Sequence, residues 1–130
     1  MSRTKDLTPH VDALVARSRA HAAAGAWDEA WSALELAHVI SQPSASLHVK
    51  AHAEMLRLAL RVGDVREVLG QLLRMTFGGI ASAAGRFPAG NTGRARVSAF
   101  APMPIPEEAR RVFAELGIDV EGVTIAGRRR

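Results

Sequence analysis

Apolar residues recur every three or four positions through the first half of the chain, a period typical of amphipathic helices. The pattern predicts helices over residues 9–24, 26–41, 46–62 and 64–77, and a fifth over 106–116. Thr8 is the expected N-cap of the first helix, with Pro9 at its first helical position. Ser44 or Ser46 is expected to cap the third helix and Asp64 the fourth. The apolar stripes predicted to face inward include these residues: Val11, Leu14, Val15, Trp27, Trp31, Leu34, Ala51, Met55, Leu58, Ala59 and Val62.

The first four predicted helices contain an internal repeat. The segments AAAGAWDEAWSALELA and LRVGDVREVLGQLLRM align with Gly25 matched to Gly63, and each consists of a helix, a glycine turn and a second helix. This arrangement resembles two tetratricopeptide-like hairpins, although the full consensus of that repeat is missing. We therefore expect an all-α fold in which two such hairpins stack.

The sequence after residue 77 changes character. Gly78-Gly79 and the stretch 85–93 are expected to be loop, and in the latter Asn91 and the neighbouring glycines are expected to form a turn with positive φ. This Gly/Pro-rich stretch is predicted to wrap over the helices before the fifth helix and its stop at Gly117. Residues 118–130 are predicted to be a tail, either a short strand or disordered.

Composition narrows the class of protein. A chain of 130 residues with 48% hydrophobic residues suits one globular domain, and the absence of cysteine excludes disulfides and thiolate ligands. No apolar run is long enough to cross a membrane and the N-terminus lacks a signal-peptide core, so a cytoplasmic location is expected. The net charge of +4 is dispersed apart from the terminal Arg128-Arg129-Arg130, which argues against nucleic-acid binding.

Three of the five histidines fall close together. His38 follows Glu35 by three positions on the second predicted helix, and His48 and His52 are four apart on the third, so each pair shares one helix face. A short connection makes the two helices antiparallel neighbours, which can bring the faces together. We predict a mononuclear metal site of His38, His48 and His52, with Glu35 as fourth ligand or outer partner. Zinc is the first expectation, while the ligand types also suit iron, copper or nickel.

The same histidines and their polar neighbours also have purely structural explanations. A histidine cluster on apolar stripes can be a core network that is hydrogen-bonded internally. Glu67 and Gln71 are one turn apart on the fourth helix and can complete a ligand set or a polar network, but a surface position is favoured for Glu67.

Several of these motifs occur together in a known family. The segments AHVISQ, HVKAHAEML, REVLGQLLR, GNTG and PMPIPEE resemble a family of small bacterial proteins described as a domain of unknown function, over about residues 10–110. The resemblance implies no activity. His10 and His21 lie outside the family pattern, and the positions that match it are these: Glu35, His38, Gln42, His48, His52, Glu67, Gln71, Asn91 and Pro104.

The leading functional hypothesis is therefore a small metal-binding protein that handles or senses an ion, with Gln42, Glu67 and Gln71 as outer partners of the site. The alternative is a non-enzymatic protein-interaction module with structural histidines, for which an exposed apolar groove and separated histidines are expected. An enzyme with a pocket roofed by residues 78–105 is a third possibility. Homodimerisation is also predicted, because a stack of two hairpins leaves an apolar end that needs cover.

Overall fold

A computed structural model describes residues 6–83, 89–97 and 103–119, the last turns of the fourth helix (77–83) by their backbone alone. The described chain is all-α. Its helices are α1 (Thr8–Ala23), α2 (Trp27–Ser41), α3 (Ala45–Val62), α4 (Val65–Ala83) and α5 (Glu107–Leu116). The predicted tail falls mostly on residues 120–130, which lie outside the described residues.

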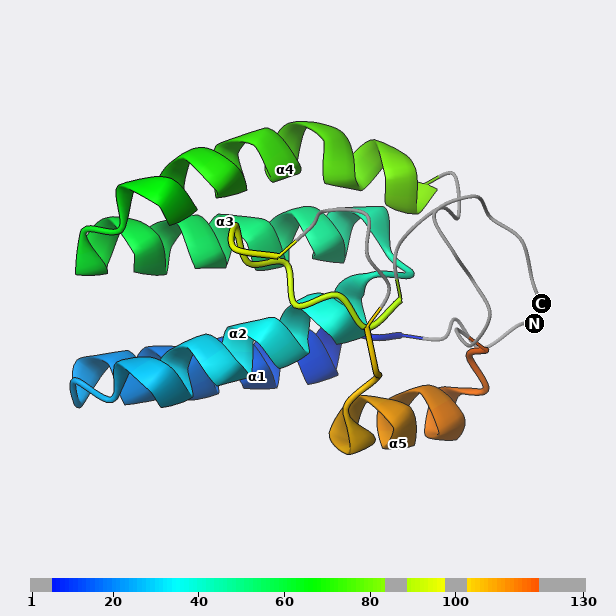
Figure 1. The fold of residues 1–130 in the computed structure, drawn as a ribbon. Helices are drawn as coiled ribbons and strands as arrows, with labels where there is room; N and C mark the ends of the chain where they lie inside the picture. Colours follow the sequence, from blue (N-terminus) through cyan, green and yellow to red (C-terminus); the bar gives the residue numbers. More distant parts are fainter. Residues whose placement is uncertain (1–5, 84–88, 98–102, 120–130) are drawn as a thin grey trace.

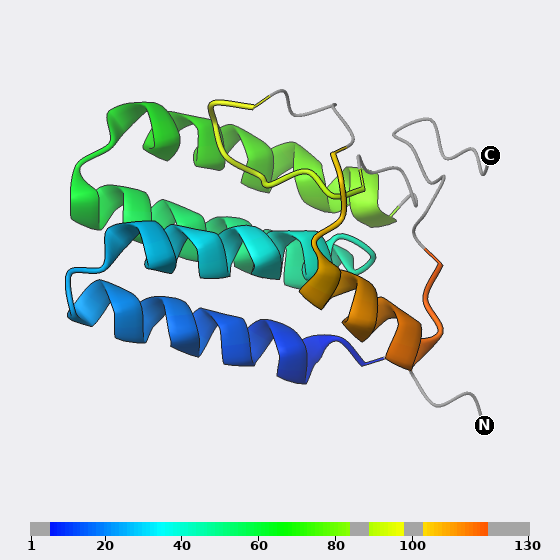
Figure 2. The same ribbon diagram turned by 60° about the horizontal axis from the view of Figure 1, so that its bottom comes forward.

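The first four helices form two hairpins laid side by side, as the tetratricopeptide-like pattern predicts. α1 packs on α2 and α3 packs on α4, while α2 and α3 join the hairpins (Figure 1). α5 crosses one end of the layer and packs on α2 (Figure 2). None of the helices in the described part of the chain has both the length and the apolar content needed to span a membrane.

Capping residues explain where several helices begin and end. The Ser44 hydroxyl accepts from the Leu47 N–H at 3.4 Å, and the Asp64 carboxylate accepts from the Glu67 N–H at 3.1 Å. Gly63 ends α3 with a φ of 76°, a left-handed conformation that suits glycine. Thr8 was expected as an N-cap but is the first residue of α1, and its own N–H is bound by the Asp6 carboxylate.

The apolar core lies between the two hairpins and under α5. It is built from small and branched side chains with few aromatics, namely Val11, Leu14, Val15, Ala30, Trp31, Leu34, Ala37, Met55, Leu58, Ala59, Val112 and Phe113. Two predicted inward residues are wrong: Trp27 is 39% exposed and Val62 is 37% exposed. Both lie at the end of the hairpins that carries the Gly25 and Gly63 turns, where no further helix is stacked on them in the described structure.

α4 differs most from expectation. It runs to Ala83, past the predicted end near residue 77, because Gly78-Gly79 continue the helix instead of forming a loop. Residues 89–97, which we call the strap, then lie over α2, α3 and α4 (Figure 2). The strap is anchored by the Met103 N–H, which donates to the Ala89 carbonyl, and by the Gly90 N–H, which donates to the Gln42 side chain.

Candidate metal centre

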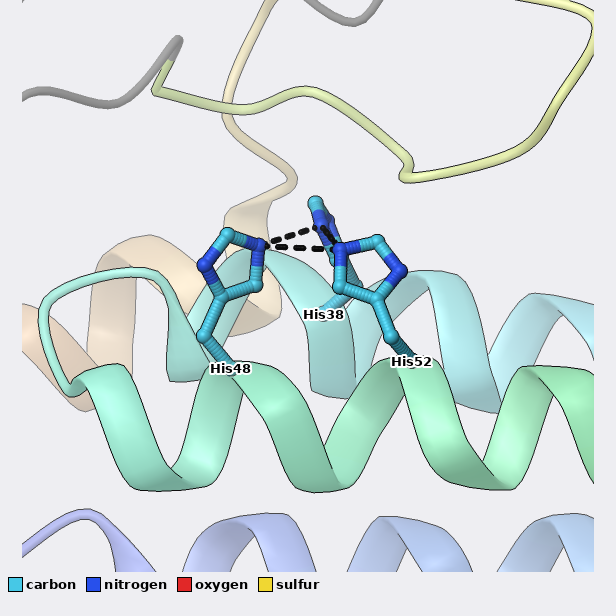
Figure 3. A group of neighbouring side chains, drawn as sticks. All are labelled: His38, His48 and His52. Carbon is cyan, nitrogen blue, oxygen red and sulfur yellow. Dashed lines mark hydrogen bonds between the residues drawn. The ribbon is translucent and has the colours of Figure 1, made fainter. Parts of the chain in front are cut away.

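Two neighbouring helices bring three imidazoles to one point. His38 projects from α2, and His48 and His52 project from successive turns of α3 toward it (Figure 3). The Nε2 atom of His38 lies 2.9 Å from that of His48 and 3.1 Å from that of His52, and the last two are 3.1 Å apart. All three side chains are buried, with 2–5% of their residue surface exposed.

The hydrogen bond on the far side of the His38 ring fixes its protonation. Its Nδ1 lies 2.7 Å from the carbonyl oxygen of Asn91, and a carbonyl oxygen can only accept. The Nδ1 must therefore carry the proton. A neutral imidazole protonated at Nδ1 has a bare lone pair at Nε2, so His38 presents a lone pair to the other two rings.

The ring of His52 is fixed in the same way by Gln71. The Gln71 amide nitrogen donates to Glu67 Oε2 at 3.0 Å and to the Gly93 carbonyl at 2.9 Å, which sets the orientation of the amide. Its oxygen therefore faces His52 Nδ1, at 2.6 Å, and can only accept. His52 is consequently also protonated at Nδ1, with a lone pair at Nε2.

Two lone pairs thus face each other across 3.1 Å in a buried site, which is repulsive unless a cation lies between them. A single proton can relieve only one pair of nitrogens at a time. A metal ion accepts all three Nε2 atoms at once. The three atoms are also the one group of ligand atoms that the described chain gathers closely enough to share an ion, all within 4.8 Å.

The distances fit a metal with small adjustment. Tetrahedral ligands at a Zn–N distance of about 2.0–2.1 Å are about 3.3–3.4 Å apart. The observed separations of 2.9–3.1 Å are a few tenths of an ångström shorter. Slight ring rotations would open the triangle far enough.

The electrostatics keep His38 and His52 in the form that binds metals. Burial lowers the pKa of His38 well below its usual value, and the neighbouring His52 and His48 lower it further. Burial likewise lowers the pKa of His52 to about 4, although the hydrogen bond with Gln71 opposes the change. Both imidazoles are therefore neutral near pH 7 and need not lose a proton to coordinate.

A charged network surrounds the rings. Glu67 was expected at the surface, but this is wrong, because the strap covers its face of α4 and leaves the residue fully buried. Its Oε1 binds Arg94 Nε at 2.6 Å and the Ala95 N–H at 3.0 Å. Burial alone would raise the pKa of Glu67, but hydrogen bonds from Gln71, Arg94 and Ala95 outweigh it and lower the pKa.

Glu35 lies at the outer end of this network. Its carboxylate is 3.4 Å from Arg94 Nη1, and the Arg94 guanidinium also stacks 3.7 Å from the centre of the Trp31 ring. Burial raises the pKa of Glu35, while Arg94 opposes that shift. The structure therefore connects Glu35 to His52 through Arg94, Glu67 and Gln71, in the position of an outer partner.

Gln42, the third expected outer partner, acts on the strap. Its Oε1 accepts from the Gly90 N–H at 3.0 Å, and it is only 1% exposed. The expected turn at Gly90 and Gly93 is present, with φ of 81° and 82°, but Asn91 does not take positive φ. Instead the Asn91 side chain accepts from the Gly93 N–H at 2.9 Å.

Residues that hold the strap were missed by the sequence analysis. Arg74 donates to the carbonyls of Gly93, Arg94 and Val97. Gly93 lies so close to His38 that an added Cβ would be 2.6 Å from the ring. No spacing pattern marks these partners, since backbone carbonyls accept from any donor that the fold brings near.

Comparison with known proteins places this chain in a family. The family model described as a protein of unknown function, DUF3703, matches residues 5–113. The chain belongs to this family. The match covers α1 to α4, most of α5, all three histidines and the strap. Neither the curated proteins nor the solved structures include a match to this chain.

Proposed function

We propose that this DUF3703 protein binds one transition-metal ion through the Nε2 atoms of His38, His48 and His52, and that it serves in metal handling or sensing. The observation that carries the proposal is the protonation of His38 and His52 at Nδ1, which leaves two lone pairs 3.1 Å apart. An ion turns this repulsion into coordination. The described chain gives each of these two ligands an outer partner of the kind that metal-bound histidines use.

Zinc is the first expectation, because three imidazoles and one open position form one of its common sites. Iron, copper and nickel accept the same ligands. We also propose a cytoplasmic location, which suits a chain without cysteine.

A role in handling the ion suits the site better than hydrolysis. Many hydrolytic metal sites place a free general base beside the metal-bound water. The two carboxylates near the rings, Glu35 and Glu67, are both engaged with Arg94. Glu67 is also held by Gln71 and the strap, so its function is to orient the ligand His52.

The alternative of an interaction module with structural histidines predicted separated histidines and an exposed apolar groove. The histidines converge. The groove beside α2, about 690 Å³ in volume, is lined by the charged Asp28, Glu35, Arg61 and Arg94 as well as by Trp27 and Trp31. Both observations favour the metal site over this alternative.

The test is metal binding by untagged protein, with zinc titrated against a chromophoric chelator and the purified protein analysed for bound metals. We expect one zinc ion per chain. Because loss of an outer partner alone costs about 10–100-fold in affinity, replacing a ligand should cost more than about 100-fold. The variants are His48→Ala and His52→Gln, the second of which keeps a polar side chain if the first perturbs folding.

The matched control is the double variant His10→Ala/His21→Ala, which removes two histidines of α1 outside the site. It should bind zinc as the native protein does, and circular dichroism should show native helicity in every variant. Flat titrations of the folded native protein with zinc, copper, nickel and iron(II) would refute the proposal. Equal binding by the site variants and the native protein would refute it as well.

A further inference from the structure

The exposed apolar side chains of this protein are concentrated in one region. Among the described residues, seven large hydrophobic side chains are exposed, and six of them lie between Leu60 and Leu73. Four belong to α4: Val65 is 70% exposed, Leu69 59%, Leu72 49% and Leu73 64%. We call these four residues the α4 stripe.

Helix geometry makes the α4 stripe continuous. Its residues are spaced by four, three and one positions, so they lie within about a third of the helix circumference. The opposite side of α4 carries Glu67, Gln71 and Arg74, which bind the strap and His52. α4 therefore turns polar side chains toward the protein and apolar side chains toward solvent, at the outer edge of the helical layer (Figure 1).

The exposed sides of α1 and α5 lack such a stripe. The exposed positions of α1 are occupied by charged or small residues such as Asp12, Ala13, Arg17 and Ala20. α5 exposes mainly charged residues, and α4 alone presents a row of leucines. The α4 stripe is therefore a local feature of this helix.

The size of the α4 stripe indicates a protein interface. At the exposures given above, its side chains present roughly 450 Å², which is as large as the largest apolar patch on a typical monomer, about 300–600 Å² and often functional. A standard interface buries about 800 Å² on each partner, with an apolar centre and a polar rim. The stripe supplies such a centre, and the flanks of α4 can supply the rim.

The charges around the stripe favour a second copy of this chain as the partner. Between Val65 and Thr76 the one charged residue on the exposed side of α4 is Arg66, near the N-terminal end. If two copies of α4 pack antiparallel about a two-fold axis near residues 69–72, leucines meet leucines. The two Arg66 side chains then lie at opposite ends, so no pair of like charges is buried.

We propose that this protein forms a homodimer through the α4 stripes of two antiparallel copies. The interface uses the outer side of α4, whereas the histidine site uses its inner side. The two proposals therefore stand on different residues, and either can fail without the other.

The first test is the mass of the untagged full chain by sedimentation equilibrium over a wide range of concentration. We expect twice the 13.9 kDa of one chain, with dissociation on dilution. The variant Leu69→Lys/Leu72→Lys should sediment as a monomer at concentrations where the native protein is dimeric, because dimerisation would bury four unpaired ammonium groups. Both substituted positions are exposed in the single chain, so native helicity should be retained.

The control Ala13→Lys/Ala20→Lys adds the same charge to the exposed side of α1 and should leave the dimer intact. A native protein that is monomeric at every concentration would overturn the proposal, as would a dimer that survives Leu69→Lys/Leu72→Lys. Zinc titration of the monomeric variant should give native affinity. This result would show that loss of the dimer and loss of metal binding are independent.

The orientation can be tested by cross-linking, since the chain has no cysteine. Under mild oxidation, Leu69→Cys or Leu72→Cys should give a disulfide-linked dimer, because both positions lie near the two-fold axis. Arg66→Cys should not, because its copies lie apart in the antiparallel arrangement. Efficient linkage at position 66 would show parallel packing and overturn the antiparallel geometry.

Discussion

The two outer helices of the layer, α1 and α4, are attached to the protein by different kinds of contact (Figure 2). α1 is held by buried apolar side chains against α2 and α3, by a buried bond from the Ser18 hydroxyl to the Ala30 carbonyl, and by surface ion pairs with Lys50, Glu54 and Glu108. α4 packs on α3 and also carries the polar residues that hold the strap. Apolar packing sets the positions of the helices, whereas polar bonds set the orientation of the imidazoles. Changes to the buried apolar side chains should therefore mainly affect stability, and changes to the polar residues around the strap should mainly affect metal binding.

The largest effect on stability is expected from the buried apolar side chains. Leu34→Ala removes a side chain that is 2% exposed between the hairpins, and should lower the free energy of unfolding by about 2–5 kcal/mol. Denaturant unfolding of the metal-free protein measures this loss. The zinc affinity of the folded variant should stay within a few-fold of native. A large loss of affinity at full helicity would show that apolar packing and metal binding are not separate.

The second effect is a pH dependence that originates in the histidines. The folded-state pKa of His52 is about 4 and that of His38 is well below 6.5, so between these values and 6.5 the unfolded chain binds more protons than the folded one. The free energy of unfolding of the metal-free protein should therefore fall as the pH drops below about 6.5, by up to about 1.4 kcal/mol per pH unit for each of the two histidines, and level off below the folded pKa.

This dependence is measured by urea unfolding at a series of pH values. His52→Gln should have a shallower slope than the native protein, whereas the control His10→Ala/His21→Ala should not. Equal slopes in the native protein and His52→Gln would show that burial does not hold His52 in its neutral form.

The smallest effect on stability is expected at the strap, where a substitution should mainly lower the affinity for zinc. Gly93 has a φ of 82°, and a Cβ there would meet the His38 ring at 2.6 Å. Gly93→Ala should cost about 1–2 kcal/mol from the left-handed backbone. The methyl group should also displace the strap from His38 and weaken zinc binding by about tenfold or more, in the range for loss of an outer partner.

Isothermal titration measures the change in affinity, and Gly25→Ala is the matched control. Gly25 has a similar φ of 72°, but an added Cβ would meet nothing within 4 Å. It should show the backbone cost without the loss of affinity. Equal zinc affinity in Gly93→Ala and the native protein would mean that the contact of the strap with His38 does not tune the site.

The sequence predicts the parts of this molecule that depend on local spacing. Helical period gives the all-α fold, and the turns at Gly25 and Gly63 give the hairpins. The spacing of His38, His48 and His52 across a short turn is enough to predict their convergence, because helix geometry fixes the relative positions of residues three or four apart. These inferences need only neighbouring residues.

The remaining features depend on contacts between distant residues. His38 is bound by a carbonyl 53 positions away, and Arg94 reaches Glu35 across 59 positions. Such partners leave no periodic signal. Glu67 illustrates the limit, since a glutamate followed by valine in REV gives no sign that the strap buries it. The outward leucines of α4 also recur at helical spacing, but spacing alone does not tell which side of the helix faces the protein.

The separation of the histidines from the strap along the chain has a consequence for synthesis on the ribosome. His38 and His52 are 14 positions apart, so all three imidazoles leave the exit tunnel well before the residues that close over them. Closing a loop of some fifty residues is slower than pairing two adjacent helices. If the protein binds a metal as proposed, a nascent chain would therefore offer its three imidazoles first and enclose them later, so that an ion could enter before the strap closes.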